Sequence, residues 1–294
     1  MRFKCILLFL IVAVLHPAFA QETQEGQKKT PKQSRFSLGL NYSFLQSRLM
    51  LFSRTESGIW QGLDYGTDTL TTEDIESVNS ISRFSGLSNT VCLEAGMVFL
   101  DNPGGHWHIS GKVLLGIART TYETYDKVKG TTDLKVTSSF SRPCLGLEFL
   151  FRYAFNPHWG LALTPYVAYS WGSTTHIEDN LDATPLNLTI NRKETSGSVY
   201  SHMAVMASYT IGNFTVSAGP GCYILFNQRT YTIDRTNPQT GSSFFNETKS
   251  VYLNKSVIDC SINLDWRIIP QLDLNLYCGI GEDILVHPGL RFLF

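Results

Sequence analysis

The sequence predicts an all-β fold: a transmembrane antiparallel up-and-down β-barrel of about ten strands, within a range of eight to twelve. Three observations predict it. Apolar and polar residues alternate over many short segments, and the connections between these segments fall into two classes of length. No stretch after the N-terminus has about 18 consecutive uncharged apolar residues, which excludes a membrane-spanning helix.

The N-terminus has the form of a secretory signal peptide. Arg2 and Lys4 precede the apolar run Cys5–Leu15, and Ala18-Phe-Ala20 fits a small-x-small cleavage site. The run is too short to cross about 30 Å of hydrocarbon as a helix. We therefore expect export, with cleavage after Ala20.

The remaining chain divides into two parts. Residues 21–34 are polar and have no apolar period, so we expect a flexible periplasmic N-terminal segment there. Alternating segments begin at about residue 35 and recur to the end, which places the barrel at 35–294.

Composition excludes several functional classes. Charged residues are 17% of the chain, against about 25% in soluble domains, and the formal net charge is -1. Neither a nucleic-acid partner nor a polybasic membrane anchor is expected. Five cysteines follow the signal peptide singly, without metal-binding spacing, and we interpret them as small apolar side chains of the strands. No cofactor is expected, because phosphate-binding glycine loops and nucleotide fingerprints are missing.

The clearest strand pattern covers residues 257–268. Ile258, Cys260 and every second residue to Ile268 share one face, while Asp259, Ser261 and their alternates share the other. The same alternation recurs in segments beginning near residues 36, 91, 107, 145, 161, 214, 272 and 290.

Two kinds of connection join these segments. Tight turns are predicted at Asp101–Gly105, Asn156–His158, Gly212–Asn213 and Pro270–Gln271. Long polar loops are predicted at about 47–86, 122–137, 174–194 and 228–251, with a shorter one near 281–288. This arrangement gives ten strands with both termini at the short-turn end, and an extra hairpin around Leu49–Phe52 would give twelve.

Prolines and aromatic residues add two local expectations. We expect bulges at Pro143, Pro165 and Pro220, because proline removes a ladder hydrogen bond. Aromatic residues flank the short turns and suit the membrane–water interface. The interface residues are predicted to be Trp107, Tyr153, Phe155, Trp159, Trp266 and Phe292.

The inner face is predicted to carry a network of charges. Glu94 and Lys112 lie about seven residues on either side of the first turn, and Glu148 lies at similar depth on the next strand, so all three should meet inside the barrel. The other members of the predicted lumen network are Arg152, Asp259, Asp265, Arg267, Asp273 and Arg291. We expect a salt-bridged plug in the narrow interior, and the alternative is a selectivity constriction in a small pore.

The signal peptide, the sorted turns, the aromatic residues and the final strand Gly289-Leu-Arg-Phe-Leu-Phe294 resemble the bacterial outer-membrane β-barrel proteins. The first strand, Phe36-Ser-Leu-Gly-Leu-Asn-Tyr-Ser-Phe44, is similar to barrel proteins of Bacteroidota. The resemblance covers the chain from about residue 35. It implies the cell outer membrane of a Gram-negative bacterium, contact with outer-membrane lipid, and recognition of Phe294 by the barrel assembly machinery.

Three catalytic or metal-binding alternatives depend on histidines. His108-Ile-Ser110 resembles the catalytic pair of outer-membrane acyl hydrolases, although it lies beside a periplasmic turn. His176, with Glu178, Asp179 and Asp182, could form the rim site of an omptin-like protease. His106 and His108 could bind a metal with a third ligand.

We predict none of these sites: no catalytic residue, no metal and no cofactor. The leading hypothesis is a non-enzymatic structural, binding or accessory protein, with a protein partner at its extracellular loops or periplasmic rim. The second is a narrow channel for small solutes, and the third is an omptin-like outer-membrane protease.

Overall fold

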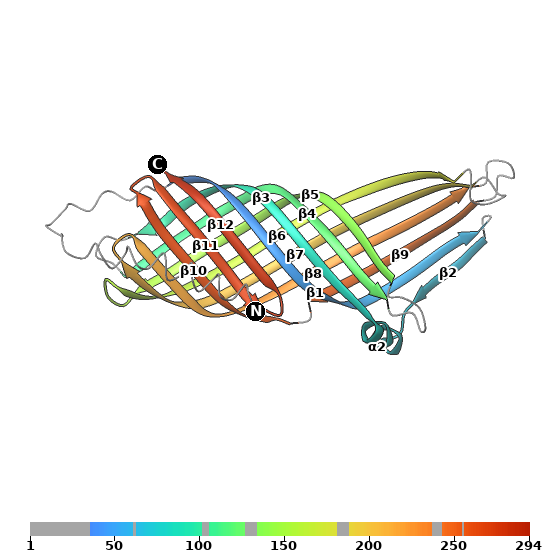
Figure 1. Ribbon diagram of the computed structural model, residues 1–294, viewed down its shortest axis with the longest axis horizontal. Coiled ribbons are helices and arrows are strands. Elements are labelled where there is room, and N and C mark those ends of the chain that lie inside the picture. The colour runs from blue at the N-terminus through green and yellow to red at the C-terminus, as the bar shows by residue number, and fades with distance from the viewer. Residues whose placement is uncertain are drawn as a thin grey trace.

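The computed structural model describes residues 36–60, 63–101, 106–126, 134–180, 188–236, 243–254 and 256–294. Within these ranges the chain is almost entirely antiparallel β-strand (Figure 1). The elements are β1 (Phe36–Trp60), β2 (Leu63–Thr69), α2 (Thr72–Ile81), β3 (Ser82–Asp101), β4 (Trp107–Asp126), β5 (Leu134–Ala154), β6 (Trp159–Asn180), β7 (Leu188–Ile211), β8 (Phe214–Thr236), β9 (Ser243–Asn254), β10 (Ile258–Ile269), β11 (Leu272–Gly281) and β12 (Ile284–Leu293).

Ten of the described strands close into a ring. Consecutive strands pair from β3 to β8. In the ring β8 then pairs with β10, and β10, β11 and β12 pair in order. The ring closes where β12 pairs with β1, with Leu38 opposite Phe292, and β1 pairs with β3 on its other side. The predicted antiparallel β-barrel is therefore confirmed, and the two further strands, β2 and β9, lie outside this ring of ten.

The ring has one end at which every connection is short. Phe36 and Phe294 meet there, and Phe294 N–H donates a 2.9 Å hydrogen bond to the carbonyl of Phe36. The turns at 156–158, 212–213 and 270–271 lie at the same end, as predicted, while residues 102–105 are outside the described part of the chain. Gly212 has a φ of 54°, a left-handed conformation that favours glycine in a two-residue hairpin.

A continuous apolar belt covers the outer surface of the ring. Outward side chains are apolar from Trp107 to Ile117 on β4, from Leu145 on β5 to Phe155 directly after it, and from Ile258 to Ile268 on β10, and many of them are exposed. Runs of about ten residues have the length at which tilted strands cross a bilayer. The belt therefore has the chemistry and the length of a lipid-facing surface. Among the described residues, no helix is long and apolar enough to cross a membrane.

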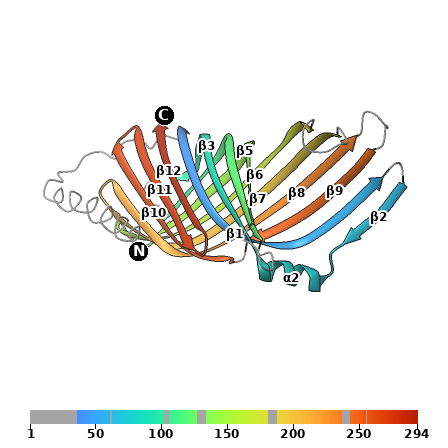
Figure 2. The same cartoon turned by 45° about the vertical axis from the view of Figure 1, so that its right-hand side comes forward.

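The long polar segments are mainly strands rather than loops. β7 has 24 residues, which at ~3.3 Å each extend to about 80 Å, far beyond the ~30 Å core of a bilayer. Together with β9 and β2, the ends of the long strands form a sheet beyond the ring, here called the projecting sheet (Figures 1 and 2). It comprises β2, β9 and residues 53–60, 171–180, 188–198 and 227–236.

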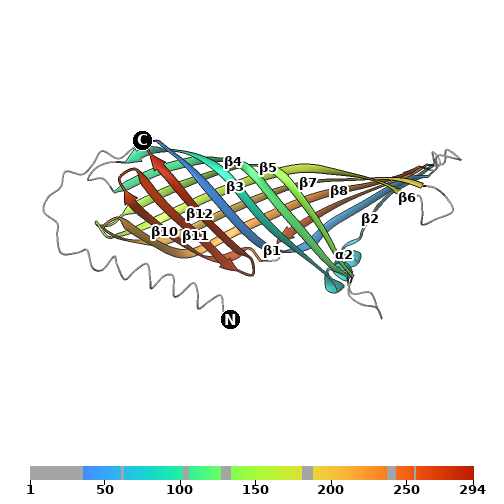
Figure 3. The same ribbon diagram turned by 45° about the horizontal axis from the view of Figure 1, so that its top comes forward.

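The prediction of loops at 47–86, 122–137, 174–194 and 228–251 was therefore wrong, because most of the described residues in these ranges lie in strands. The strands leave the ring as a thin layer, which Figure 3 shows tapering away from it. Leu49–Phe52 belongs to β1 itself and forms no separate hairpin. The turn near 281–288 is also shorter than expected, because β11 ends at Gly281 and β12 begins at Ile284.

The ring changes into the projecting sheet where β9 takes the place of β10, β11 and β12 between β8 and β1. Two polar side chains satisfy backbone groups at this junction. Asn254 accepts a hydrogen bond from Leu225 N–H at 2.9 Å and donates one to the carbonyl of Tyr223 at 3.2 Å. Asp283 accepts the N–H of Arg48 at 2.7 Å. These contacts replace the ladder bonds lost where strands separate.

The wall also splits between β5 and β6. Their pairing ends at Cys144 and Ser170, beyond which β5 pairs only with β4 and β6 only with β7. Arg142 crosses this seam on the inner side and donates hydrogen bonds to Ser196 at 3.0 Å and Ser198 at 3.3 Å on β7.

The expected proline bulges do not occur. Residues on both sides of Pro143, Pro165 and Pro220 keep one register with each neighbouring strand. The ladder instead has short gaps beside Pro165 and Pro220, so the lost donors are accommodated without an inserted residue. The irregular registers lie elsewhere, at Val98–Leu100 and Arg267–Ile269 among others.

Candidate functional site

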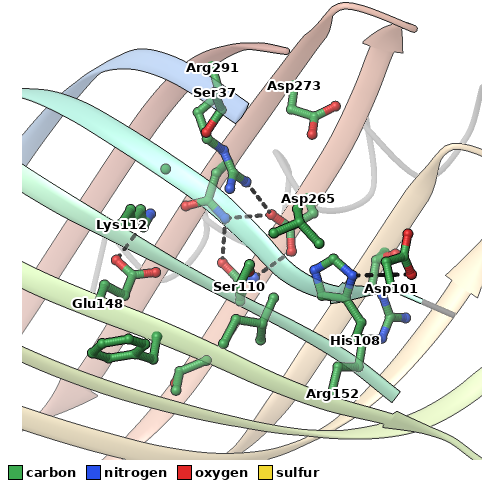
Figure 4. Close-up of a pocket in the computed structure, with 18 of the residues that line it drawn as sticks. Ser37, Asp101, His108, Ser110, Lys112, Glu148, Arg152, Asp265, Asp273 and Arg291 are labelled. Carbon is green, nitrogen blue, oxygen red and sulfur yellow. Dashed lines mark hydrogen bonds and ion pairs between the residues drawn. The ribbon is translucent and has the colours of Figure 1, made fainter. Parts of the chain in front are cut away.

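The barrel interior holds a cavity of about 490 Å³ in its short-turn half. Ser37 and His108 contribute near the short turns, while Tyr166, Leu285 and His287 contribute at its deeper end. Charged side chains from opposite sides of the ring line the space between (Figure 4). This cavity is an interior space in which the protein could hold a solute.

Lys112 lies between two carboxylates on neighbouring strands. Its Nζ is 3.0 Å from Glu148 Oε2 and 3.5 Å from Glu94 Oε2. Register explains the contact, because Lys112 stands opposite Glu148 and lies diagonally across from Glu94, two residues along β4 from Leu114, which is opposite Glu94. The side chain of Glu94 is only 1% exposed, so its charge depends on these partners.

Arg291 extends the network across the closure of the ring. Its Nε is 3.5 Å from Glu94 Oε1, and its Nη2 is 3.4 Å from Asp265 Oδ1. Asn263 and Asn275 each donate a 2.7 Å hydrogen bond to Asp265. Charges from β3, β4, β5, β10 and β12 are therefore joined in one network, as the inward-facing pattern predicts.

Four predicted members lie apart from that chain of contacts: Arg152, Arg267, Asp273 and Asp259, the last of which is described below. Arg267 and Asp273 form their own pair, with Nε 3.0 Å from Oδ1. Arg152 lines the cavity and donates a 2.5 Å hydrogen bond to Thr210. Its guanidinium group makes no ion pair within 4.0 Å among the described residues.

Asp259 belongs to a second cluster that sequence reasoning missed. Asp259 Oδ2 is 3.0 Å from His202 Nε2, and Ser261 and Tyr277 complete the group. Gly221 leaves room for it, since a Cβ there would lie 2.1 Å from Asp259 Oδ1. The alternation of β10 places Asp259 and Ser261 inward, but nothing in the sequence pairs them with His202 on β7.

The cluster contains Ser, His and Asp without the arrangement of a hydrolase triad. Asp259, Ser261 and Tyr277 all approach the same nitrogen, His202 Nε2, at 3.0, 3.4 and 3.0 Å. A relay needs the carboxylate on one ring nitrogen and the nucleophile on the other. The geometry is that of a buried structural network.

Above the cavity, apolar and aromatic side chains pack together in the interior. The buried members of this closing layer are Leu49, Tyr200, Tyr223, Leu225 and Leu285. Leu45, Phe84, Tyr166, Tyr252 and Tyr277 pack against them. These residues come from strands around most of the ring, so the layer bridges the interior.

The closing layer adds an apolar part to the predicted salt-bridged plug. Charges line the cavity as expected, and tyrosine and leucine side chains cluster above them. The sequence does not reveal this, because an inward tyrosine on a strand has the same alternation as an inward serine.

The histidine alternatives gain little from the geometry. His108 Nδ1 is 3.5 Å from Asp101 Oδ1, and His108 and Ser110 both line the cavity. His106 Nδ1 is 2.7 Å from the carbonyl of Ala154. In the described part of the chain, no group of three or more His, Cys, Asp or Glu is arranged to hold a metal. His176, Glu178 and Asp179 lie on β6 rather than in a loop, and Asp182 is outside the described residues.

The predicted interface aromatics gather on the outer surface at the short-turn end. Trp107, Phe155, Trp159, Trp266 and Phe292 are all exposed. Tyr153 packs between Trp107 and Phe155, with ring centroids 4.9 and 5.4 Å away. Phe294 is also exposed, beside the first residue of β1.

No protein-family model matches the sequence, and no curated protein sequence matches it. Solved structures that resemble it include the transport unit of the autotransporter AIDA-I from Escherichia coli, with 10% identity over 95% of this chain and 96% of that one and a TM-score of 0.36. An outer-membrane channel from Pseudomonas putida F1 has 11% identity over 93% and 100%, with a TM-score of 0.37. The outer-membrane protease OmpT from Escherichia coli has 9% identity over 92% and 99%, with a TM-score of 0.37. At these TM-scores the similarities assign no activity to this chain.

Proposed function

We propose that the chain is a closed outer-membrane barrel of a Gram-negative bacterium, which acts by presenting the projecting sheet outside the cell. The closing layer carries this proposal. Tyr200, Tyr223 and Leu285 fill the interior above the cavity, so a solute entering from the short-turn end meets packed side chains. The role is binding or structural and non-enzymatic.

Orientation follows from the two ends of the ring. Bacterial barrels keep their termini and short turns on the periplasmic side. Phe36 and Phe294 therefore face the periplasm, and the projecting sheet faces outward. The apolar belt contacts outer-membrane lipid, and the resemblance to Bacteroidota barrels supports this location.

Two protein partners follow from the same orientation. Phe294, exposed at the end of the last strand, is the proposed recognition residue for the barrel assembly machinery. The projecting sheet is the proposed surface for an external protein partner, because its described side chains are largely polar and, among the described residues, β2 and the end of β6 each form a strand ladder on one side. The periplasmic rim is the alternative surface.

Conductance in a planar lipid bilayer tests closure. The wild-type protein should show no stable unitary currents. A Tyr200→Ala, Tyr223→Ala double variant removes two rings from the closing layer and should produce them. Tyr169→Ala is the matched control, since Tyr169 lies on the outer surface and stacks on Trp171 at 5.2 Å.

A narrow channel for small solutes is the second candidate, favoured by the charged cavity beneath the closing layer. It predicts steady unitary currents from the wild-type protein, with a size or ion preference that changes in Lys112→Ala or Glu148→Ala. That result would replace the closed-barrel proposal.

A further inference from the structure

Two cysteines face each other inside the barrel across a glycine. Cys92 on β3 stands opposite Gly116 on β4, and Gly116 stands opposite Cys144 on β5. A Cβ on Gly116 would lie 2.6 Å from Cys92 Sγ, so that sulfur lies over the glycine that separates the two cysteines. The two thiols interact with each other, and both cysteines are buried. None of the functions considered above uses this pair.

Strand spacing separates the pair too widely for a relaxed disulfide. Adjacent strands lie about 4.8 Å apart, so backbones two strands apart are separated by roughly 9.5 Å. Two Cα atoms more than about 7 Å apart are not bridged without backbone movement. A metal ion between the two sulfurs bridges a longer distance than a disulfide does. With metal–sulfur bonds of about 2.3 Å, as for zinc, two sulfurs on opposite sides of the ion are about 4.6 Å apart.

The residues around the two thiols favour a soft monovalent metal ion. Leu114 and Ala118, the inward neighbours of Gly116 along β4, are 1% and 3% exposed. Zinc prefers four ligands, whereas soft thiolates select copper(I), which is stable with two. Among the described residues, no third His, Cys, Asp or Glu completes a larger metal site here.

Arg142 provides a positive charge that balances the negative charge of a metal–thiolate complex. It lies two residues from Cys144 on the same face of β5, is 1% exposed, and acts electrostatically on that thiol. A copper(I) ion held by two thiolates carries one negative charge. The guanidinium of Arg142 opposes that charge in a region closed to water.

We propose that Cys92 and Cys144 form a two-coordinate site for copper(I) inside the barrel. Binding forms two sulfur–copper bonds and releases the two thiol protons to solvent, and neither sulfur is oxidised. The complex and Arg142 together are neutral. The site is independent of whether the barrel conducts.

Metal retention tests the site. The reduced, folded full chain is incubated with copper(I), and separately with silver(I) as a redox-stable probe, then desalted against a weak competing ligand. Atomic spectroscopy should find about one ion per chain, with loss of binding in Cys92→Ser and in Cys144→Ser. Cys278→Ser, at another buried cysteine, should bind like the wild type.

A second measurement needs no variant. Native mass spectrometry of the wild type should show one bound copper ion with loss of two protons. Failure to retain an ion, or equal retention in the wild type and both serine variants, would overturn the proposal. A non-reducing digest that finds Cys92 joined to Cys144 in the isolated protein would overturn it as well, by assigning the pair to a cross-link.

Discussion

Lys112 is the residue on which the charge network of the cavity depends most. It is 10% exposed and lies between Glu94 and Glu148, whereas Glu94 also has Arg291 as a partner. Removing one partner of a buried ion pair leaves the other charge unsolvated, which is the costly case.

Lys112→Met should therefore destabilise the barrel by about 3 kcal/mol. The double variant Lys112→Met, Glu148→Gln should recover part of the loss, because no unpaired Glu148 carboxylate remains. Urea unfolding in lipid vesicles measures both changes.

Lys249→Met provides the comparison. Lys249 is 55% exposed and pairs with Glu247 at 2.7 Å, so its loss should change stability by less than about 1 kcal/mol. Equal effects at Lys112 and Lys249 would contradict the role given to the buried network.

Residue contacts were predictable where local register determines them. Glu94, Lys112 and Glu148 lie on consecutive strands joined by a short turn or by neighbouring pairing, so counting from the turn places them together. His202 and Asp259 lie on β7 and β10, which are separated in the ring by β8. No count along one hairpin relates them, and Gly221, which makes room between them, has no signature of its own.

At the scale of elements, the seam between β5 and β6 depends on a glycine. Arg142 passes over Gly172 on its way to Ser196 and Ser198, and a Cβ on Gly172 would lie 2.7 Å from Arg142 Cγ. A side chain at this position must displace the arginine from its hydrogen bonds.

Gly172→Ala should loosen the seam while leaving the belt intact. Faster amide hydrogen exchange is expected in residues 134–143 and 171–180, where the wall is already split. Gly197→Ala on β7 is the matched control, because its added Cβ would meet nothing closer than Tyr169 Oη at 3.6 Å. Unchanged exchange in Gly172→Ala would show that Arg142 does not hold the seam.

The lengths of the strands were the part of the fold that could not be predicted from the sequence. In the belt, one face of each strand is apolar and largely exposed, and the alternation is plain. Beyond the belt, polar residues occur at both alternating sets of positions, so segments such as Thr189–Thr195 have no apolar period to count. Their strand structure comes from pairing with partners, which composition does not report.

At the scale of the whole molecule, orientation in the membrane is the claim to test. Lys249→Cys places a thiol on the projecting sheet, where Lys249 is exposed. It should react with a membrane-impermeant maleimide on intact cells. Asn213→Cys, in the short turn between β7 and β8, should react only after the outer membrane is opened.

Maleimide labelling of the unmodified protein gives the background reaction of its own cysteines. Reaction of Asn213→Cys on intact cells, with none at Lys249→Cys, would invert the proposed orientation. Equal labelling of both variants would place both ends of the barrel in one compartment and contradict a membrane-spanning chain.

The projecting sheet is continuous with the membrane wall, because β1, β6, β7 and β8 pass from one into the other without a break. This continuity has a mechanical consequence. A pull on the tip, from a tethered surface or a flowing medium, loads several backbone ladders along their length, so many hydrogen bonds must slide together before any strand detaches. Loops of the same composition would stretch first and transmit little. The projecting sheet is thus stiffly coupled to the ring.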